Sequence, residues 1–167
     1  MGAGKTTIGR LIAEELNKEF FDSDQVIEER AGADIAWIFD VEGEDGFRQR
    51  ERRVIRELCA MDNIVLATGG GAILAEQNRK AMRKHGVVVY LMATISQQVE
   101  RTKRDQKRPL IRDSADPRAK LTSLMELREP LYREIADISV MTSRRSPRAV
   151  SSEILKMLEG ESHADSL

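Results

Sequence analysis

Two spacings of apolar residues alternate along this chain. Apolar residues three and four apart predict helices, which begin near residues 5, 24, 34, 44, 75, 94, 117 and 147. Short continuous apolar runs between them predict strands at residues 19–21, 64–68, 87–91 and 138–141. Strands that alternate with helices are typical of a layered α/β fold, so we expect a three-layer α/β/α arrangement around a parallel sheet. The run at residues 87–91 is apolar throughout, which predicts a strand buried on both faces.

The length of the chain fits one domain. At 167 residues it is long enough for a sizeable core, and no internal repeat or linker divides it. Residues 104–118 are polar, basic and contain prolines, which predicts a surface loop that can act as a lid. We therefore expect a single domain over residues 1–167, acting as a monomer.

Charge and composition exclude several classes of partner. Lys and Arg (27) nearly balance Asp and Glu (28), and only 4% of residues are aromatic, so a nucleic-acid partner is not expected. No apolar run is long enough to span a membrane, and no membrane partner is expected. Cys59 is the only cysteine and cannot form an internal disulfide, which favours a reducing compartment. We expect a cytoplasmic protein.

A glycine-rich stretch at the start of the chain predicts a phosphate-binding loop. The sequence Gly-Ala-Gly-Lys-Thr-Thr at residues 2–7 matches the second half of a P-loop and leads directly into an amphipathic helix. In such loops the backbone amides and the helix N-terminus bind phosphate, the lysine reaches the β- and γ-phosphates, and the first Ser or Thr hydroxyl binds Mg²⁺. The alternative is a flexible terminal tail, but the uninterrupted helix favours the loop.

Polar residues and glycines follow two of the predicted strands. Asp22 and Asp24 come after the strand at residues 19–21, and spacing by two would point both carboxylates into one cleft. One could hold Mg²⁺ through water and the other a substrate hydroxyl, although Asp and Ser are also common in turns and helix caps. The glycines at residues 69–71 follow the strand at residues 64–68, and they form either a tight turn or a backbone that approaches a ligand closely.

Three arginines stand out from the surface charges. Arg48 follows Phe47 on a predicted helix, and Arg128 lies four residues after Leu124, near an apolar face. A guanidinium in such a position needs a partner such as a carboxylate. Arg108 lies in the predicted lid, where it could reach a transferring phosphate. The other arginines of the run at residues 48–53 are interpreted as solvated surface charge.

These motifs, in this order, resemble the shikimate kinases, which are P-loop kinases related in fold to the nucleoside monophosphate kinases. The matching stretches are GAGKTTIGR, FFDSD, GFRQRE, ATGGGA, KRPL, LREPLY and TSRRSP. They span residues 2–147, nearly the whole chain. The resemblance implies transfer of the γ-phosphoryl group of ATP to the 3-hydroxyl of shikimate, with Mg²⁺. It also implies a substrate-binding helical segment at about residues 25–55 and a lid at about residues 104–118.

The resemblance also implies roles for individual residues. Lys5, Asp24 and Arg108 would be catalytic, with Asp24 binding the shikimate hydroxyls and acting as base. Thr6, and Asp22 through water, would hold the metal. Shikimate would be bound by Asp24, Arg48, Gly69, Gly70, Gly71 and Arg128, with the two arginines on its carboxylate. ATP would be bound by Gly2, Ala3, Gly4, Lys5, Thr6, Thr7, Arg101, Arg108 and Arg145, with Arg101 and Arg145 flanking the adenine.

The start of the chain departs from the family pattern. The first glycine of the loop and a strand before it, central in the sheet of the family, have no counterpart in residues 1–167. We expect the natural chain to carry this strand before Met1, between the strands that end at Thr68 and Leu91. Two alternatives remain open at this point. The chain could be a related kinase of another small hydroxy acid such as gluconate, or an N-terminally truncated inactive form.

Overall fold

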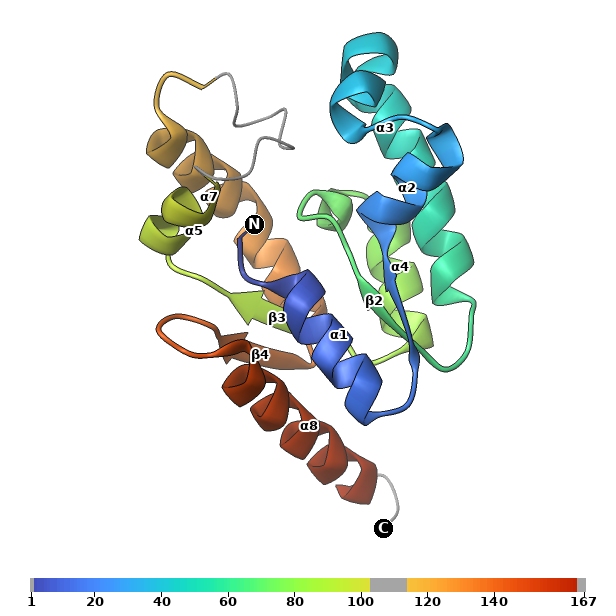
Figure 1. The fold of residues 1–167 in the computed structure, drawn as a ribbon, viewed down its shortest axis with the longest axis vertical. Helices are drawn as coiled ribbons and strands as arrows, with labels where there is room; N and C mark the ends of the chain where they lie inside the picture. Colours follow the sequence, from blue (N-terminus) through green and yellow to red (C-terminus); the bar gives the residue numbers. More distant parts are fainter. Residues whose placement is uncertain (1, 103–113, 165–167) are drawn as a thin grey trace.

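The structure, a computed structural model, describes residues 2–102 and 114–164 (Figure 1). Its helices are α1 (Lys5–Glu15), α2 (Ser23–Ala31), α3 (Ile35–Cys59), α4 (Glu76–His85), α5 (Ile95–Thr102), α7 (Pro117–Ile135) and α8 (Pro147–Ala164), with a 3-10 turn, η1 (Ala72–Leu74). Its strands are β1 (Glu19–Asp22), β2 (Ile64–Ala67), β3 (Val89–Met92) and β4 (Ile138–Met141). Most of the predicted lid, including Arg108, lies outside the described residues.

Local signals explain where most helices begin. The side chains of Asp22, Asp34 and Asp116 accept hydrogen bonds from the first backbone amides of α2, α3 and α7, as N-cap residues do. The two helices predicted at residues 34–42 and from residue 44 form one span, α3, with a break at Gly43. The φ angle of Gly43 is 72°, in the left-handed region that glycine adopts without strain.

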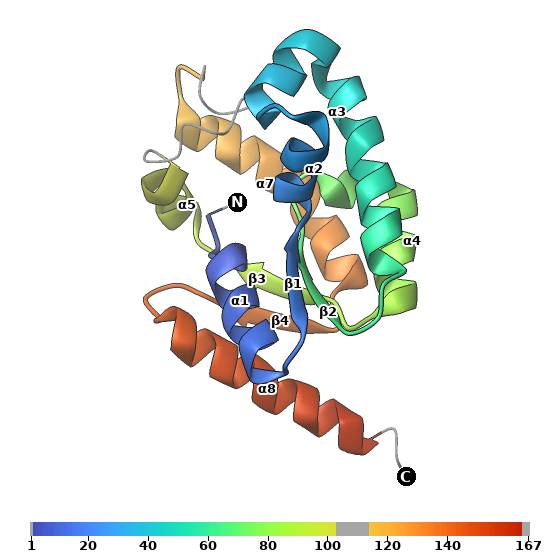
Figure 2. The same cartoon turned by 45° about the vertical axis from the view of Figure 1, so that its right-hand side comes forward.

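The four described strands form two parallel pairs. β1 pairs with β2, and β3 pairs with β4, so the predicted parallel pairing is confirmed. Among the described residues no ladder joins β2 to β3, and the two pairs lie apart in Figures 1 and 2. The expectation of a further strand between them, before Met1, stays a prediction.

Helices pack on both sides of the strands, as expected for an α/β/α fold. α1 packs against α8 and, with β4, forms one apolar core around Ile8, Ile12 and Ile154, against which Val65 of β2 packs. α2 and α3 form a second core around Ile38 and other residues, against which Ile64 and Leu66 of β2 pack. Successive residues of β2 therefore face opposite cores, which is the alternation of a strand between two helical layers.

The prediction that residues 87–91 are buried on both faces is wrong. All four residues of β3 are only half-buried, and Val87, before the strand, is 51% exposed. Among the residues that the structure describes, β3 pairs with β4 on one edge only, and its residues Val89, Tyr90 and Leu91 line a cavity. Within residues 2–102 and 114–164, no helix is both long enough and apolar enough to cross a membrane.

Candidate active site

Most of the predicted binding residues meet in one cleft. Its volume is about 460 Å³, which is within the range of about 300–1,000 Å³ that small-molecule sites occupy. It lies where α1 and α2 begin and β2 ends, and α5 and the segment before α8 also contribute to it. The predicted residues that line it are Gly2, Ala3, Gly4, Lys5, Thr6, Thr7, Asp22, Asp24, Gly69, Gly70, Arg101 and Arg145.

The glycine loop has the backbone that an anion site requires. Gly2 and Gly4 have φ angles of 64° and 88°, in the left-handed region, and Gly4 is the N-cap residue of α1. The first backbone amides of a helix have no acceptor within the helix, and they carry the positive end of its dipole. The loop at residues 2–7 can therefore bind phosphate, as the sequence predicts.

Thr6 and Asp22 lie next to each other beside the loop. The Thr6 hydroxyl donates a hydrogen bond to Asp22 Oδ2, with an oxygen–oxygen distance of 2.9 Å. The other carboxylate oxygen, Asp22 Oδ1, accepts from the backbone amide of Asp24 at 3.0 Å and so caps α2. The prediction that strand spacing points both carboxylates into one cleft is wrong in its reason, because only Asp22 belongs to β1 and Asp24 lies in α2, near the predicted helix start at residue 24. The strand ends at Asp22 because Asp22 caps the helix, and Asp24 reaches the same cleft from the first turn of α2.

The triple glycine packs directly against predicted substrate-binding residues. A Cβ added at Gly69 would lie 2.6 Å from Asp24 Oδ1, and one added at Gly71 would overlap the Arg48 guanidinium. The backbone amide of Gly69 also donates to Ser23 Oγ at 3.2 Å. Glycine therefore serves close approach here, rather than only a turn, because a Cβ at either position would displace the Asp24 carboxylate or the Arg48 guanidinium from its observed place.

Arg48 and Arg128 lie behind the glycines, outside the lining of the cleft. Arg128 is only 3% exposed, and it is close enough to Arg48 for each charge to affect the other. Burial lowers the pKa of the Arg128 guanidinium, and the positive charge of Arg48 adds to this effect. The Nε atoms of both arginines are buried and have no hydrogen-bond partner among the described residues. A buried and a half-buried guanidinium, each with an unused Nε donor, favour an anionic ligand beside them.

Glu51 is a residue of this site that the sequence analysis missed. Its carboxylate is 1% exposed and accepts a hydrogen bond from Arg48 Nη1 at 2.7 Å. Burial raises the pKa of the Glu51 carboxyl, and the effect exceeds the opposing influence of Arg48. Its position three residues after Arg48 on a helix was a signal for pairing. The signal was missed because Glu51 lies within a run of charged residues that was interpreted as surface charge. That interpretation does apply to Arg50, which forms an exposed ion pair with Glu42.

The Glu51 carboxyl gives a prediction about the pH dependence of stability. Its raised pKa means that the folded protein binds this proton more tightly than the unfolded chain does. The stability that this contributes is complete below the ordinary glutamate pKa of about 4.3, and is lost as the pH rises through the folded-state value. The free energy of unfolding of the wild type should therefore fall between about pH 5 and about pH 8. We expect this fall to be smaller in the Glu51→Gln variant. Urea unfolding at both pH values measures this, and equal losses would contradict it.

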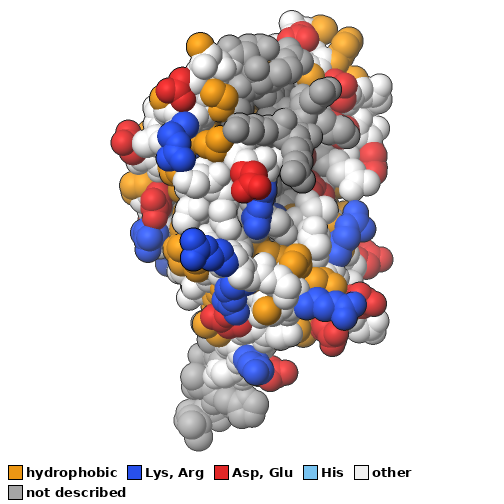
Figure 3. All heavy atoms as spheres, turned by 60° about the vertical axis from the view of Figure 1, so that its left-hand side comes forward, with side chains coloured by type: hydrophobic (Ala, Val, Ile, Leu, Met, Phe, Trp, Pro, Cys, Tyr) orange, Lys and Arg blue, Asp and Glu red, His pale blue; other side chains and the backbone are white. Residues whose placement is uncertain are grey.

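Two further arginines border the cleft near the glycine loop. Arg101 of α5 donates a hydrogen bond to the backbone oxygen of Gly2, and Arg145 forms an ion pair with Glu153 of α8. Arg101 and Arg145 both line the cleft that contains the glycine loop, and their predicted place beside the adenine stays a prediction; Arg108 lies outside the described residues. On the face shown in Figure 3, basic side chains are interspersed with acidic ones, so the described residues of that face form no extended basic patch.

Comparisons with known proteins agree with this geometry. The family model described as shikimate kinase matches residues 1–159. The chain is 53% identical to a shikimate kinase of Haemophilus influenzae (strain PittEE) over 95% of this chain and 88% of that protein. It is 56% identical to one of Legionella pneumophila (strain Corby), over 96% and 91% of the two chains. The structure of a shikimate kinase from Acinetobacter baumannii in complex with shikimate superposes with a TM-score of 0.94, at 46% identity, over 96% of this chain and 89% of that one.

Proposed function

This chain belongs to the shikimate kinase family, and we propose how its cleft binds the two substrates of the reaction. As a member of that family it transfers the γ-phosphoryl group of ATP to shikimate, a step in aromatic amino acid biosynthesis. The triphosphate of ATP binds to residues 2–7, and shikimate binds against Gly69, Gly70 and Gly71. The reacting hydroxyl then lies between Asp24 and the γ-phosphate.

One observation carries this placement. Gly69 lies against the Asp24 carboxylate and Gly71 against the Arg48 guanidinium, with no room for a side chain at either position. The Asp24 carboxylate, which accepts hydrogen bonds, and the Arg48 guanidinium, which donates them, therefore lie against the same short stretch of backbone, residues 69–71. This stretch is beside the glycine loop. The hydroxyls of shikimate can donate to Asp24, and its carboxylate can accept from Arg48. We assign the shikimate carboxylate to Arg48 and Arg128, whose planar guanidinium groups match it.

The cleft provides what phosphoryl transfer requires of a protein, which is alignment of the substrates and neutralisation of charge. Phosphoryl transfer is catalysed mainly by alignment of the reacting groups and by neutralisation of the charge on the phosphoryl oxygens. Lys5 lines the cleft at the start of α1, where its ammonium can stabilise the β- and γ-phosphates. Asp24 accepts the proton of the shikimate hydroxyl as that oxygen bonds to the γ-phosphorus, while the bond from this phosphorus to the bridging oxygen breaks and ADP leaves.

The site also fits a magnesium ion. Thr6 and Asp22 offer a hydroxyl and a carboxylate oxygen 2.9 Å apart beside the glycine loop, and Mg²⁺ prefers such oxygen ligands. No group of three or more His, Cys, Asp or Glu residues suited to a metal occurs among the described residues. This suits Mg²⁺, which usually binds one or two protein oxygens together with phosphate and water. When bound, the ion would neutralise charge on the triphosphate, with Asp22 holding it through water.

The remaining assignments follow from the same placement. Arg101 and Arg145 border the cleft beside Gly2, so we assign the adenine to the space between them. Arg108, as a lid arginine on the ATP phosphates, stays a prediction. We also propose a cytoplasmic monomer, and the single cysteine supports the cytoplasmic location.

The substitution Arg128→Lys tests the placement of shikimate. The charge is kept but the bidentate fork is lost, so we expect the KM for shikimate to rise about tenfold or more, with the KM for ATP changed less than about twofold. Arg133→Lys is the matched control, because Arg133 lies on the same helix in an exposed ion pair with Glu129. A KM for shikimate that is equal in Arg128→Lys and the control would remove Arg128 from the carboxylate site.

A further inference from the structure

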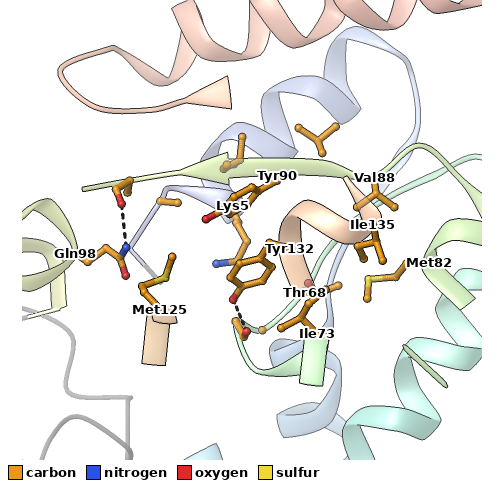
Figure 4. Close-up of a pocket in the computed structure, with 16 residues that line it drawn as sticks. Lys5, Thr68, Ile73, Met82, Val88, Tyr90, Gln98, Met125, Tyr132 and Ile135 are labelled. Atoms are coloured by element: carbon orange, nitrogen blue, oxygen red, sulfur yellow. Dashed lines mark hydrogen bonds between the residues drawn. The ribbon is translucent and has the colours of Figure 1, made fainter. Parts of the chain in front are cut away.

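Tyr132 joins two parts of the site that are far apart in the sequence. It lies on α7 four residues after Arg128, so both side chains are on the same side of the helix. Its hydroxyl donates a hydrogen bond to the backbone oxygen of Gly70, with an oxygen–oxygen distance of 2.5 Å. Figure 4 shows this bond, with Lys5 and Tyr132 pointing into the same small cavity, of about 80 Å³.

The Tyr132 ring is held in place from another element. It stacks on Tyr90 of β3, with 4.8 Å between ring centroids and 23° between ring planes. Burial raises the pKa of the Tyr132 phenol, which keeps the hydroxyl protonated and able to donate at neutral pH. A stacked ring with a protonated hydroxyl gives the bond to Gly70 a fixed direction.

The same hydroxyl also interacts with Arg128. Arg128 lies one turn before Tyr132 on α7, and its interaction with the phenol opposes the lowering of the Arg128 pKa by burial. Arg128 can only donate, so the phenol oxygen faces it as an acceptor while the hydroxyl hydrogen is donated to Gly70. Tyr132 thus orients Arg128 and the glycine backbone relative to each other through one atom.

The neighbours of Gly70 explain why this matters for the substrate. Gly69 lies against Asp24 and Gly71 against Arg48, so a displacement of Gly70 would move the backbone relative to both side chains. Two of the groups assigned to shikimate, Arg128 and the glycine backbone, therefore take their relative position from Tyr132.

The geometry points to Tyr132 as a positioning residue for shikimate, which fixes Arg128 and Gly70 at the spacing that the acid requires. The inference rests on the proposed placement of shikimate. A positioning role differs from a general role in folding, because loss of the Tyr132 hydroxyl would weaken the binding of shikimate and leave the binding of ATP unaffected.

The substitution Tyr132→Phe tests this, because it removes one oxygen and keeps the ring stack. We expect the KM for shikimate to rise roughly tenfold, the size expected for loss of a hydrogen bond to a charged group, with the KM for ATP within about twofold. The control is Tyr90→Phe, which changes the other ring of the stack and leaves the bond to Gly70. KM does not depend on the fraction of folded enzyme, so partial unfolding would not imitate this result.

A second measurement reports on the loop itself. Hydrogen–deuterium exchange of a peptide that covers residues 68–72, in the protein without substrate, is expected to be faster in Tyr132→Phe than in Tyr90→Phe. The inference is overturned if Tyr132→Phe leaves the KM for shikimate unchanged while Arg128→Lys raises it. If neither substitution affects shikimate, the proposed placement of the substrate fails as well. A parallel rise in both KM values would show that Tyr132 has only a structural role.

Discussion

The substitution Asp24→Asn is expected to lower kcat by about 10²–10⁴-fold, the contribution of a positioned general base. The side chain keeps its shape and still reaches the reacting hydroxyl, but its amide is not basic enough to accept the proton. Gly69 lies against Asp24, so the side chain is confined to the position from which it can act. The KM for ATP is expected to change little, because Asp24 is assigned to shikimate.

Asp34→Asn is the matched control for this variant. Asp34 is an exposed N-cap residue of α3 whose side chain accepts from the backbone amide of Trp37, and asparagine caps helices as well as aspartate does. ADP release coupled to a second enzyme gives kcat for both variants. A kcat for Asp24→Asn within about threefold of the control would show that proton removal does not pass through Asp24.

The substitution Lys5→Met is expected to lower kcat/KM for ATP by about 10²–10³-fold, the loss seen when one charge-stabilising donor is removed from a site. Lys5 is the first residue of α1, and methionine is a good helix former of similar length, so the helix should still form. The loss should therefore come from the missing ammonium at the triphosphate, rather than from unfolding.

Lys80→Met is the control for the lysine. Lys80 forms an exposed i,i+4 ion pair with Glu76 on α4, and such pairs contribute only about 0.3–0.5 kcal/mol to stability. We expect the control to keep the wild-type rate and the same melting temperature within about 2 °C. If Lys5→Met retained more than about one tenth of the wild-type kcat/KM, the glycine loop would not bind phosphate in the proposed way.

Much of the fold could be predicted because its signals are local. Three helices begin at aspartates that act as caps, and the strands are short apolar runs between helices. The cleft residues were predictable for a related reason, since the ends of parallel strands meet at one edge of a sheet and the functional residues follow those ends. The separation of the strands into two pairs depends on contacts between distant segments, which local patterns do not encode.

The parts of the site that were missed are also those that depend on distant contacts. Glu51 resembles a surface charge in the sequence, and only the packing of α3 shows that it is buried beside Arg48. Tyr132 resembles a core residue, and its bond to Gly70 joins positions 62 residues apart. Strand spacing was the reason for predicting Asp24 in this cleft, but Asp24 reaches it from the first turn of α2, because Asp22 both ends the strand and caps that helix.

The most direct test of the account is the rate of ADP release by the 167-residue chain with Mg²⁺, ATP and one of three acceptors. Shikimate, shikimate methyl ester and gluconate are compared, with a reaction without acceptor as the blank. The account predicts release that depends on shikimate, a kcat/KM at least tenfold lower for the ester, which lacks the charge that Arg48 and Arg128 bind, and no gluconate-dependent release. Equal rates with shikimate and its ester, or release with gluconate but not with shikimate, would contradict it.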